Sequence, residues 1–140
     1  MRFMIIVKAN ADSEAGVMPE AEAMDEMGRF NEALIGAGIL LGAEGLAASS
    51  KGAKVRFKGG KTTVVDGPFA EAKELIAGYW LVQVKSKDEA IAWARKAPMG
   101  DGAELEVRQV HEMSDFADAD PEMLRKEQDW RAANQKPMTN

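Results

Sequence analysis

The sequence predicts a single α+β domain of the ferredoxin-like, split βαβ type, with an inserted β-hairpin and a C-terminal extension. Three observations indicate this class: a continuous apolar run at residues 3–7, two segments with helical periodicity, and alternating segments around Gly59-Gly60 and at residues 104–110. We expect residues 1–110 to form the domain. Residues 111–140 are expected to pack on the domain or on a dimer partner.

The first half of the chain predicts strand, helix and strand. Residues 2–8 have an apolar centre bounded by polar residues, as in a strand buried on both faces. Pro19 suits the first turn of a helix, which would run for about five turns before Gly36. Residues 39–42 are short and apolar, and we expect a second strand there. The apolar side chains at helical spacing are Met24, Met27, Phe30 and Leu34.

A hairpin and a central strand follow. Residues 54–58 and 61–65 alternate on either side of Gly59-Gly60, and paired glycines supply the positive φ angles of a two-residue hairpin turn. Residues 78–84 are rich in aromatic and β-branched side chains, which favours a central strand. In that strand, Tyr79 and Trp80 must point to opposite faces.

The last part of the domain predicts a helix and a strand. Ser86 and Glu89 have capping-box spacing, which places the start of a helix after Ser86, and Pro98 should end it. Residues 104–110 alternate, so Leu105 and Val107 share one face while Glu106 and Arg108 share the other. Beyond the domain we expect irregular chain, a short helix at residues 121–133, and a frayed end from residue 135.

Composition excludes several classes of function. The chain has no cysteine and one histidine, His111, so disulfides, thiolate metal sites, cysteine nucleophiles and ordinary zinc sites are not expected, and no cofactor is indicated. No apolar run reaches the roughly 18–20 residues of a membrane span, and the start of the chain resembles no targeting segment. We therefore expect a cytoplasmic protein that does not bind membranes. A net charge of −5 and the lack of an aromatic-rich sheet signature argue against nucleic-acid binding.

Charge is unevenly distributed along the chain. Residues 45–65 contain five bases and no acid, whereas residues 112–122 contain five acids and no base. One interpretation is a solvated hairpin whose charges block edge-to-edge aggregation. The other is that the basic segment attracts an anionic ligand or docks onto the acidic tail of a partner subunit.

A motif gives the most specific information. Asp66-Gly67-Pro68-Phe69 is followed by Glu71, Lys73 and Glu74 and then by an apolar strand with Gly78 and Tyr79. This pattern resembles the DGPF proteins of the YCII-related family, and the resemblance covers residues 1–110. It implies a dimeric α+β barrel, in which the sheet of a second identical subunit covers the free sheet face and a small molecule binds between the sheets. It also implies an association with extracytoplasmic-function sigma factors, because relatives are often encoded beside them.

Asp66 is the candidate catalytic residue. As a general base it would act at the mouth of the inter-sheet cleft; alternatively, Asp-Gly-Pro is turn chemistry in which the side chain bonds a nearby amide. The resemblance also implies a His-Asp pair in shorter family members, but no histidine precedes His111, so that pair does not carry over. His111 is interpreted as a surface or tail-docking residue.

Candidate substrate-binding residues surround the motif and the predicted cleft. Lys73 is expected to reach an anionic group while Glu71 or Glu74 holds it, although a solvated turn explains all three. Glu44 lies between glycines that allow close approach. On the sheet, Glu106 and Arg108 would face the cleft, as a salt bridge or as ligand-binding groups. The full set is Glu44, Lys73, Glu74, Tyr79, Glu106 and Arg108.

Two functions from different classes remain open at this stage. The first is a homodimeric, cofactor-free enzyme that acts on a small carbonyl or acidic compound by proton transfer. The second is a non-catalytic ligand-binding or regulatory accessory protein. The sequence does not decide whether the protein is an enzyme.

Overall fold

A four-stranded antiparallel sheet with the order β2-β5-β1-β6 organises the computed structural model, which describes residues 1–140. The strands are β1 (Arg2–Lys8), β2 (Leu40–Gly45), β5 (Ile76–Gln83) and β6 (Leu105–Gln109). All three pairings in this sheet are antiparallel. This order is the split βαβ arrangement, so the predicted α+β, ferredoxin-like class is confirmed.

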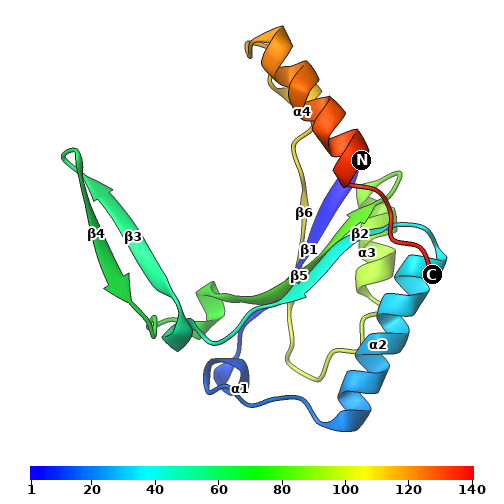
Figure 1. Cartoon of the computed structure of the whole chain (residues 1–140). Coiled ribbons are helices and arrows are strands. Elements are labelled where there is room, and N and C mark those ends of the chain that lie inside the picture. Colours follow the sequence, from blue (N-terminus) through cyan, green and yellow to red (C-terminus); the bar gives the residue numbers. More distant parts are fainter.

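Two helices, α2 (Ala21–Gly36) and α3 (Lys87–Ala94), cover one face of this sheet (Figure 1). Phe30 of α2 meets Trp80 of β5 edge to face, with ring centroids 5.2 Å apart, and the Trp80 indole N–H donates to the Asn31 side chain at 2.8 Å. Trp80 therefore lies on the helix-covered face, and Tyr79 on the opposite one. The largest fully buried side chains of the core are Phe3, Ile5, Leu34, Leu40 and Val82.

The other face of the sheet, which we call the open face, is not covered by a helix (Figure 1). Its apolar side chains, among them Met4, Ile6 and Leu81, are only half-buried. In the whole chain 14 of 140 residues are buried, so this chain by itself leaves much apolar surface in contact with water. No helix of the structure is both long and apolar enough to cross a bilayer.

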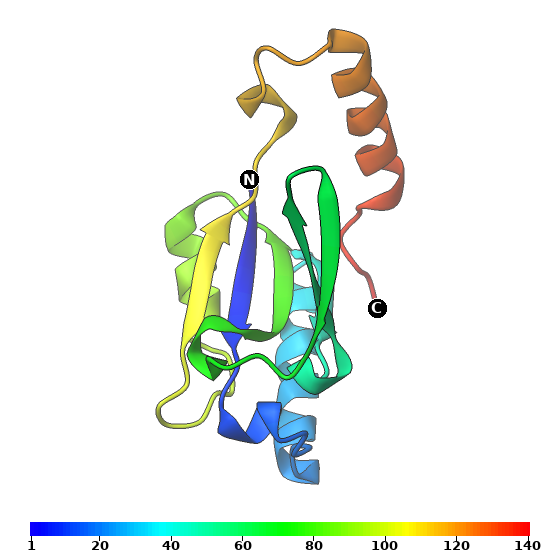
Figure 2. The ribbon, with the colours of Figure 1, turned by 90° about the vertical axis from the view of Figure 1, so that its left-hand side faces the viewer.

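The inserted hairpin forms a separate two-stranded sheet of β3 (Ala53–Lys58) and β4 (Lys61–Asp66). Gly59 and Gly60 adopt φ angles of +58° and +75°, as the paired glycines predicted. The hairpin projects away from the sheet, and every residue of both strands is exposed (Figure 1). Viewed from the open side, it stands in front of the sheet, while the C-terminal helix lies above it (Figure 2).

Helix boundaries differ from the sequence predictions at several points. A short helix, α1 (Ala11–Glu14), was not predicted, α2 starts after Pro19 rather than at it, and α3 ends before reaching Pro98. At the start of α3, the Ser86 hydroxyl accepts from the Glu89 amide at 3.1 Å as predicted. The Glu89 carboxylate, however, accepts from the Lys85 amide at 2.9 Å and not from Ser86, because it reaches one residue further back.

The C-terminal extension consists of a 3-10 turn, η3 (Met113–Asp115), and helix α4 (Pro121–Asn134). The expectation of a frayed end was wrong at Met138, whose amide donates to the Leu40 carbonyl at 2.7 Å. The chain end thus returns to the domain. Two further 3-10 turns flank the hairpin, η1 (Ser49–Lys51) before it and η2 (Ala72–Glu74) after it.

Candidate functional site on the open sheet face

Four residues from four different strands form one row across the open face. Glu44 of β2 is the Cα partner of Tyr79 of β5, Tyr79 is the partner of Ile6 of β1, and Ile6 is the partner of Glu106 of β6. Residues directly opposite each other in antiparallel strands have neighbouring side chains on one face. The register therefore brings the predicted residues Glu44, Tyr79 and Glu106 to the same level of the sheet.

The next row on the same face adds apolar residues and a cation. Leu81 of β5 pairs with Met4 of β1, and Met4 pairs with Arg108 of β6. The open face thus has an apolar centre of Met4, Ile6 and Leu81. Charged side chains lie on its outer strands, with Glu44 at one edge and Arg108 at the other.

An ion-pair network lies at the β6 edge of the row. Lys8 Nζ is 2.9 Å from one Glu106 oxygen, and Arg108 Nε is 3.9 Å from the other. The hydrogen bond from Lys8 lowers the pKa of Glu106 below its ordinary value of 4.5, desolvation opposes this effect, and the charges of Lys8 and Arg108 add to it. Glu106 is therefore an anion at neutral pH. The long Arg108–Glu106 distance and the exposed Arg108 side chain leave guanidinium donors free for a ligand.

The opposite edge of the row has a different character. Glu44 forms no ion pair or side-chain hydrogen bond within the chain, and its partner on the adjacent strand is Tyr79. Strands β2 and β5 approach closely here, since a Cβ placed on Gly78 would lie 2.7 Å from the Glu44 carbonyl oxygen. Glycine at position 78 allows this approach and so fixes where Glu44 meets Tyr79.

Asp66 lies apart from the row, at the end of β4 where the hairpin meets the domain. Its carboxylate is exposed and makes no hydrogen bond within the chain, so the side-chain-to-amide bond of the turn interpretation is not formed. The rest of the motif closes the hairpin base: the Gly67 amide donates to the Gly52 carbonyl at 3.0 Å, and the Phe69 amide donates to Ser49 Oγ at 3.0 Å.

Sequence reasoning missed the residues that hold the motif. Both oxygens of the Glu14 carboxylate accept hydrogen bonds from Ser49, one from its amide and one from its hydroxyl. Lys54 Nζ lies 4.3 Å from the centre of the Phe69 ring, a cation–π contact. Because Glu14 is 35 residues from Ser49 and belongs to no motif, no local spacing signals this contact.

Lys73 and Glu74 are exposed on η2, near the end of β1, where the Ala9 amide donates to the Leu75 carbonyl at 2.9 Å. The structure does not bring either side chain into the row of Glu44, Tyr79 and Glu106. Within the chain they form no ion pair with each other. They lie on the connection from the hairpin to β5, at the same end of the sheet as Lys8.

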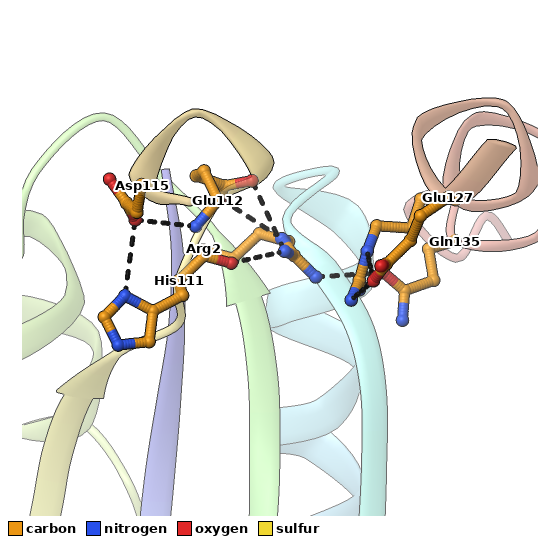
Figure 3. Close-up of polar contacts among 7 residues, drawn as sticks. Arg2, His111, Glu112, Asp115, Glu127 and Gln135 are labelled. Carbon is orange, nitrogen blue, oxygen red and sulfur yellow. Dashed lines mark hydrogen bonds and ion pairs between the residues drawn. The ribbon is translucent and has the colours of Figure 1, made fainter. Parts of the chain in front are cut away.

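A second polar cluster joins the C-terminal extension to the domain (Figure 3). The side chain of Arg2 is nine-tenths buried, and it donates to the Glu112 carboxylate at 3.2 and 3.3 Å, to the His111 carbonyl at 3.0 Å and to the Gln135 side chain at 3.0 Å. His111 Nδ1 lies 3.4 Å from Asp115 Oδ2. The Glu112 amide, and secondarily His111, lower the pKa of Asp115. The contacts of Arg2 join β1 to the chain before η3 and to the end of α4, so the cluster positions the extension.

No group of three or more His, Cys, Asp or Glu side chains in the structure is arranged to hold a metal ion. The groups that the open face offers to a ligand are carboxylates, cations, a phenol and apolar side chains. These groups bind and orient polar molecules through hydrogen bonds and charge.

Comparison with known proteins agrees with the motif. Residues 1–114 match the YCII-related domain. The chain belongs to the YCII-related family. It is also 34% identical over 76 residues to an uncharacterized protein of Rhizobium meliloti (strain 1021), an alignment that covers 54% of this chain. This YCII-related chain spans 61% of the length of that relative.

Proposed function

We propose that this YCII-related protein is a homodimer whose two open faces enclose a binding chamber for a small polar molecule. The observation that supports this proposal is the row of Glu44, Tyr79, Ile6 and Glu106, which brings polar groups from three strands together around Ile6 on an uncovered face. A second sheet is the partner of matching shape, since two sheets pack about 10 Å apart through their side chains.

The small number of buried residues supports the dimer. Met4, Ile6 and Leu81 are half-buried in the isolated chain and lie together at the centre of the face. Full burial of an exposed side chain of this kind contributes about 1.5–3 kcal/mol, so covering the part of these three that is still exposed in each subunit adds a fraction of that amount per side chain and favours association. Charged residues at both edges of the face would keep the rim polar, as in most interfaces.

The charges indicate the class of ligand. Arg108 would bind a carboxylate, because its guanidinium is exposed and only loosely paired with Glu106. Tyr79 would donate to a carbonyl oxygen, and Glu44 would accept from a hydroxyl group on the far side. A small carbonyl compound with an acidic group fits this arrangement, with Lys8 keeping Glu106 ionised.

The same chamber could also serve an enzyme, in which Asp66 would act as the general base. Its carboxylate is free of partners, but it lies at the hairpin base, away from the row. The placement favours the binding role over proton transfer within one chain. A non-catalytic or regulatory accessory protein, associated with an extracytoplasmic-function sigma factor, is therefore the alternative that uses the same chamber without Asp66.

The test combines oligomeric state with ligand binding. Sedimentation velocity at micromolar concentration should find a dimer, and Leu81→Lys on the open face should shift it to monomer. A thermal-shift screen of small carboxylates, lactones and aldehydes should then give a ligand that stabilises the wild type. We expect the shift to disappear in Tyr79→Phe and Arg108→Gln and to persist in Glu74→Gln, which changes an exposed carboxylate outside the row. A monomeric wild type, or a ligand insensitive to both open-face variants, contradicts the proposal.

The screen also separates binding from catalysis. If Asp66→Asn retains the thermal shift and no ligand is consumed by the wild type, the accessory role holds. Loss of turnover in Asp66→Asn, with the shift retained, would instead assign the chemistry to Asp66.

A further inference from the structure

The projecting hairpin, residues 53–66, has one apolar and one basic face; we call it the arm. Val55 pairs with Val64 and Phe57 pairs with Thr62, so these four side chains share a face. Val55, Phe57 and Val64 are 53%, 80% and 67% exposed. The opposite face carries the four bases of the arm, which are Lys54, Arg56, Lys58 and Lys61.

An arm with this composition needs a partner. A two-stranded hairpin alone is marginally stable in water, and here both of its faces are exposed. Contiguous exposed apolar side chains rimmed by polar ones mark interaction surfaces. Within the chain, only the base of the arm is held, through Ser49 and Phe69. The apolar face of the arm is therefore not covered by any other part of the same subunit.

A matching surface lies on the C-terminal extension. A groove of about 700 Å³ runs between η3 and α4. Three of its apolar side chains, Phe116, Met123 and Trp130, are 44%, 62% and 57% exposed. Beside it lies the acidic segment of residues 112–122, with five acids and no base. The groove is thus mainly apolar inside, with the acidic segment along the η3 side, while Lys126, Glu127 and Arg131 of α4 line the other side.

We propose that the arm of one copy lies in the extension groove of a second copy. Val55, Phe57 and Val64 fill the apolar lining. The long side chains of the bases on the opposite face extend past the arm edges to the acidic segment. This contact rests on the homodimer proposed above and adds to it a defined second interface. It also gives the extension, residues 111–140, a role in holding the partner subunit.

The dimensions and positions fit this exchange. Six residues per strand give the arm a length of about 20 Å at 3.3 Å per residue. The 14 residues of α4 span about 21 Å. The arm leaves the sheet at the end where Lys8 lies, whereas α4 lies at the Arg2 end (Figure 1). A two-fold axis between facing sheets and perpendicular to the strands brings these opposite ends together.

Cross-linking tests the contact directly, because the chain has no cysteine of its own. The double variant Val64→Cys/Met123→Cys, treated with a short bismaleimide, should give a covalent dimer on denaturing gels. Each single variant should stay mostly monomeric on the same gel. A dimeric wild type with no covalent dimer from the double variant overturns the arm contact alone. A monomeric wild type removes the homodimer, and the arm contact with it.

A matched pair of substitutions tests the face that is used. Val64 and Val65 are neighbours in β4, are both exposed, and point to opposite faces. Val64→Asp should raise the dimer dissociation constant about tenfold or more, whereas Val65→Asp, with the same charge change, should alter it by less than about twofold. Equal effects overturn the assignment of the apolar face.

Salt and competing partners complete the test. Raising the NaCl concentration should weaken the wild-type dimer more than it weakens the dimer of a Lys58→Gln/Lys61→Gln variant. The variant lacks two of the charges whose attraction the salt screens. The wild type should not bind anionic vesicles or short duplex DNA. The proposal is overturned if the wild type binds vesicles or DNA, Lys58→Gln/Lys61→Gln abolishes that binding, and Val64→Asp leaves the dimer unchanged. The arm would then be assigned to that partner.

Discussion

Lys8 and Glu106 form a 2.9 Å ion pair that joins β1 to β6 on the open face of the sheet. Neither residue belongs to the core, and Glu106 lies in the row that carries Tyr79 and Glu44. Lys8 keeps the Glu106 carboxylate ionised on a face where a partner would cover an uncharged side chain at lower cost. The pair therefore provides fixed charge for a ligand rather than a source of protons.

The Lys8–Glu106 pair predicts a pH dependence of stability. The pKa of Glu106 is lower in the folded protein than its ordinary value of 4.5, so the pair stabilises the fold above that pH. This contribution is lost as the pH falls through the lower folded pKa. Urea unfolding of Glu106→Gln should show a smaller loss of stability on acidification below pH 4.5 than the wild type. Glu104→Gln, which removes a neighbouring carboxylate without an ion-pair partner, should keep the wild-type profile.

The Trp80–Asn31 hydrogen bond should contribute measurably to stability. Trp80 is 4% exposed, so an Asn31→Leu change leaves its indole N–H buried without an acceptor. The free energy of unfolding should fall by about 1–3 kcal/mol in urea titrations. In a Trp80→Phe background the same change should cost clearly less, because the unpaired donor is gone. Equal costs in the two backgrounds would show that the bond is not responsible.

Gly67 is expected to be required for the hairpin base. A Cβ at this position would lie 1.8 Å from the Ser49 carbonyl oxygen, a backbone atom that cannot move aside cheaply. Gly67→Ala should therefore destabilise the protein by about 1–3 kcal/mol and speed hydrogen exchange in β3 and β4. Gly28→Ala is the matched control, because it lies in α2 with no atom within 4 Å of the new Cβ. That change should stabilise the helix by up to about 1 kcal/mol.

Arg2 is expected to hold the extension against the domain. Removing its buried guanidinium in Arg2→Ala breaks the contacts to Glu112, Gln135 and the His111 carbonyl. Local detachment of α4 should become easier by about 2–3 kcal/mol, because hydrogen bonds to charged groups are the stronger kind. Limited proteolysis should then cut α4 much faster. Arg125→Ala, which removes an exposed arginine 3.9 Å from Asp129, should leave the cutting rate unchanged.

Local signals in the sequence predicted most elements. The glycine pair marked the turn of the arm, the Ser86 hydroxyl marked the start of α3, and alternation separated Glu106 from Leu105. Each of these depends on residues within a few positions of each other, where propensity and periodicity act directly. The motif at Asp66 likewise indicated the family. Those features could be predicted without knowing which strands become neighbours.

The candidate site could be predicted only in part. Alternation separated Tyr79 from Trp80 and Glu106 from Leu105, but the register of three strand pairings decided that Tyr79 and Glu106 share a row with Glu44. The same pairing left Asp66, Lys73 and Glu74 outside that row. Contacts such as Glu14–Ser49 and Arg2–Glu112 join residues 35 and 110 positions apart.

The sequence by itself determined the order of the strands and of the two helices that cover the sheet, which residues of a strand share a face, and the unequal distribution of charge. Only the tertiary structure decided which side chains meet across the sheet, that the arm projects with its apolar face uncovered, and that Arg2 holds the extension. The physical reason is range: helix and strand periodicity depend on neighbouring residues, whereas register and long-range ion pairs depend on how the whole chain packs.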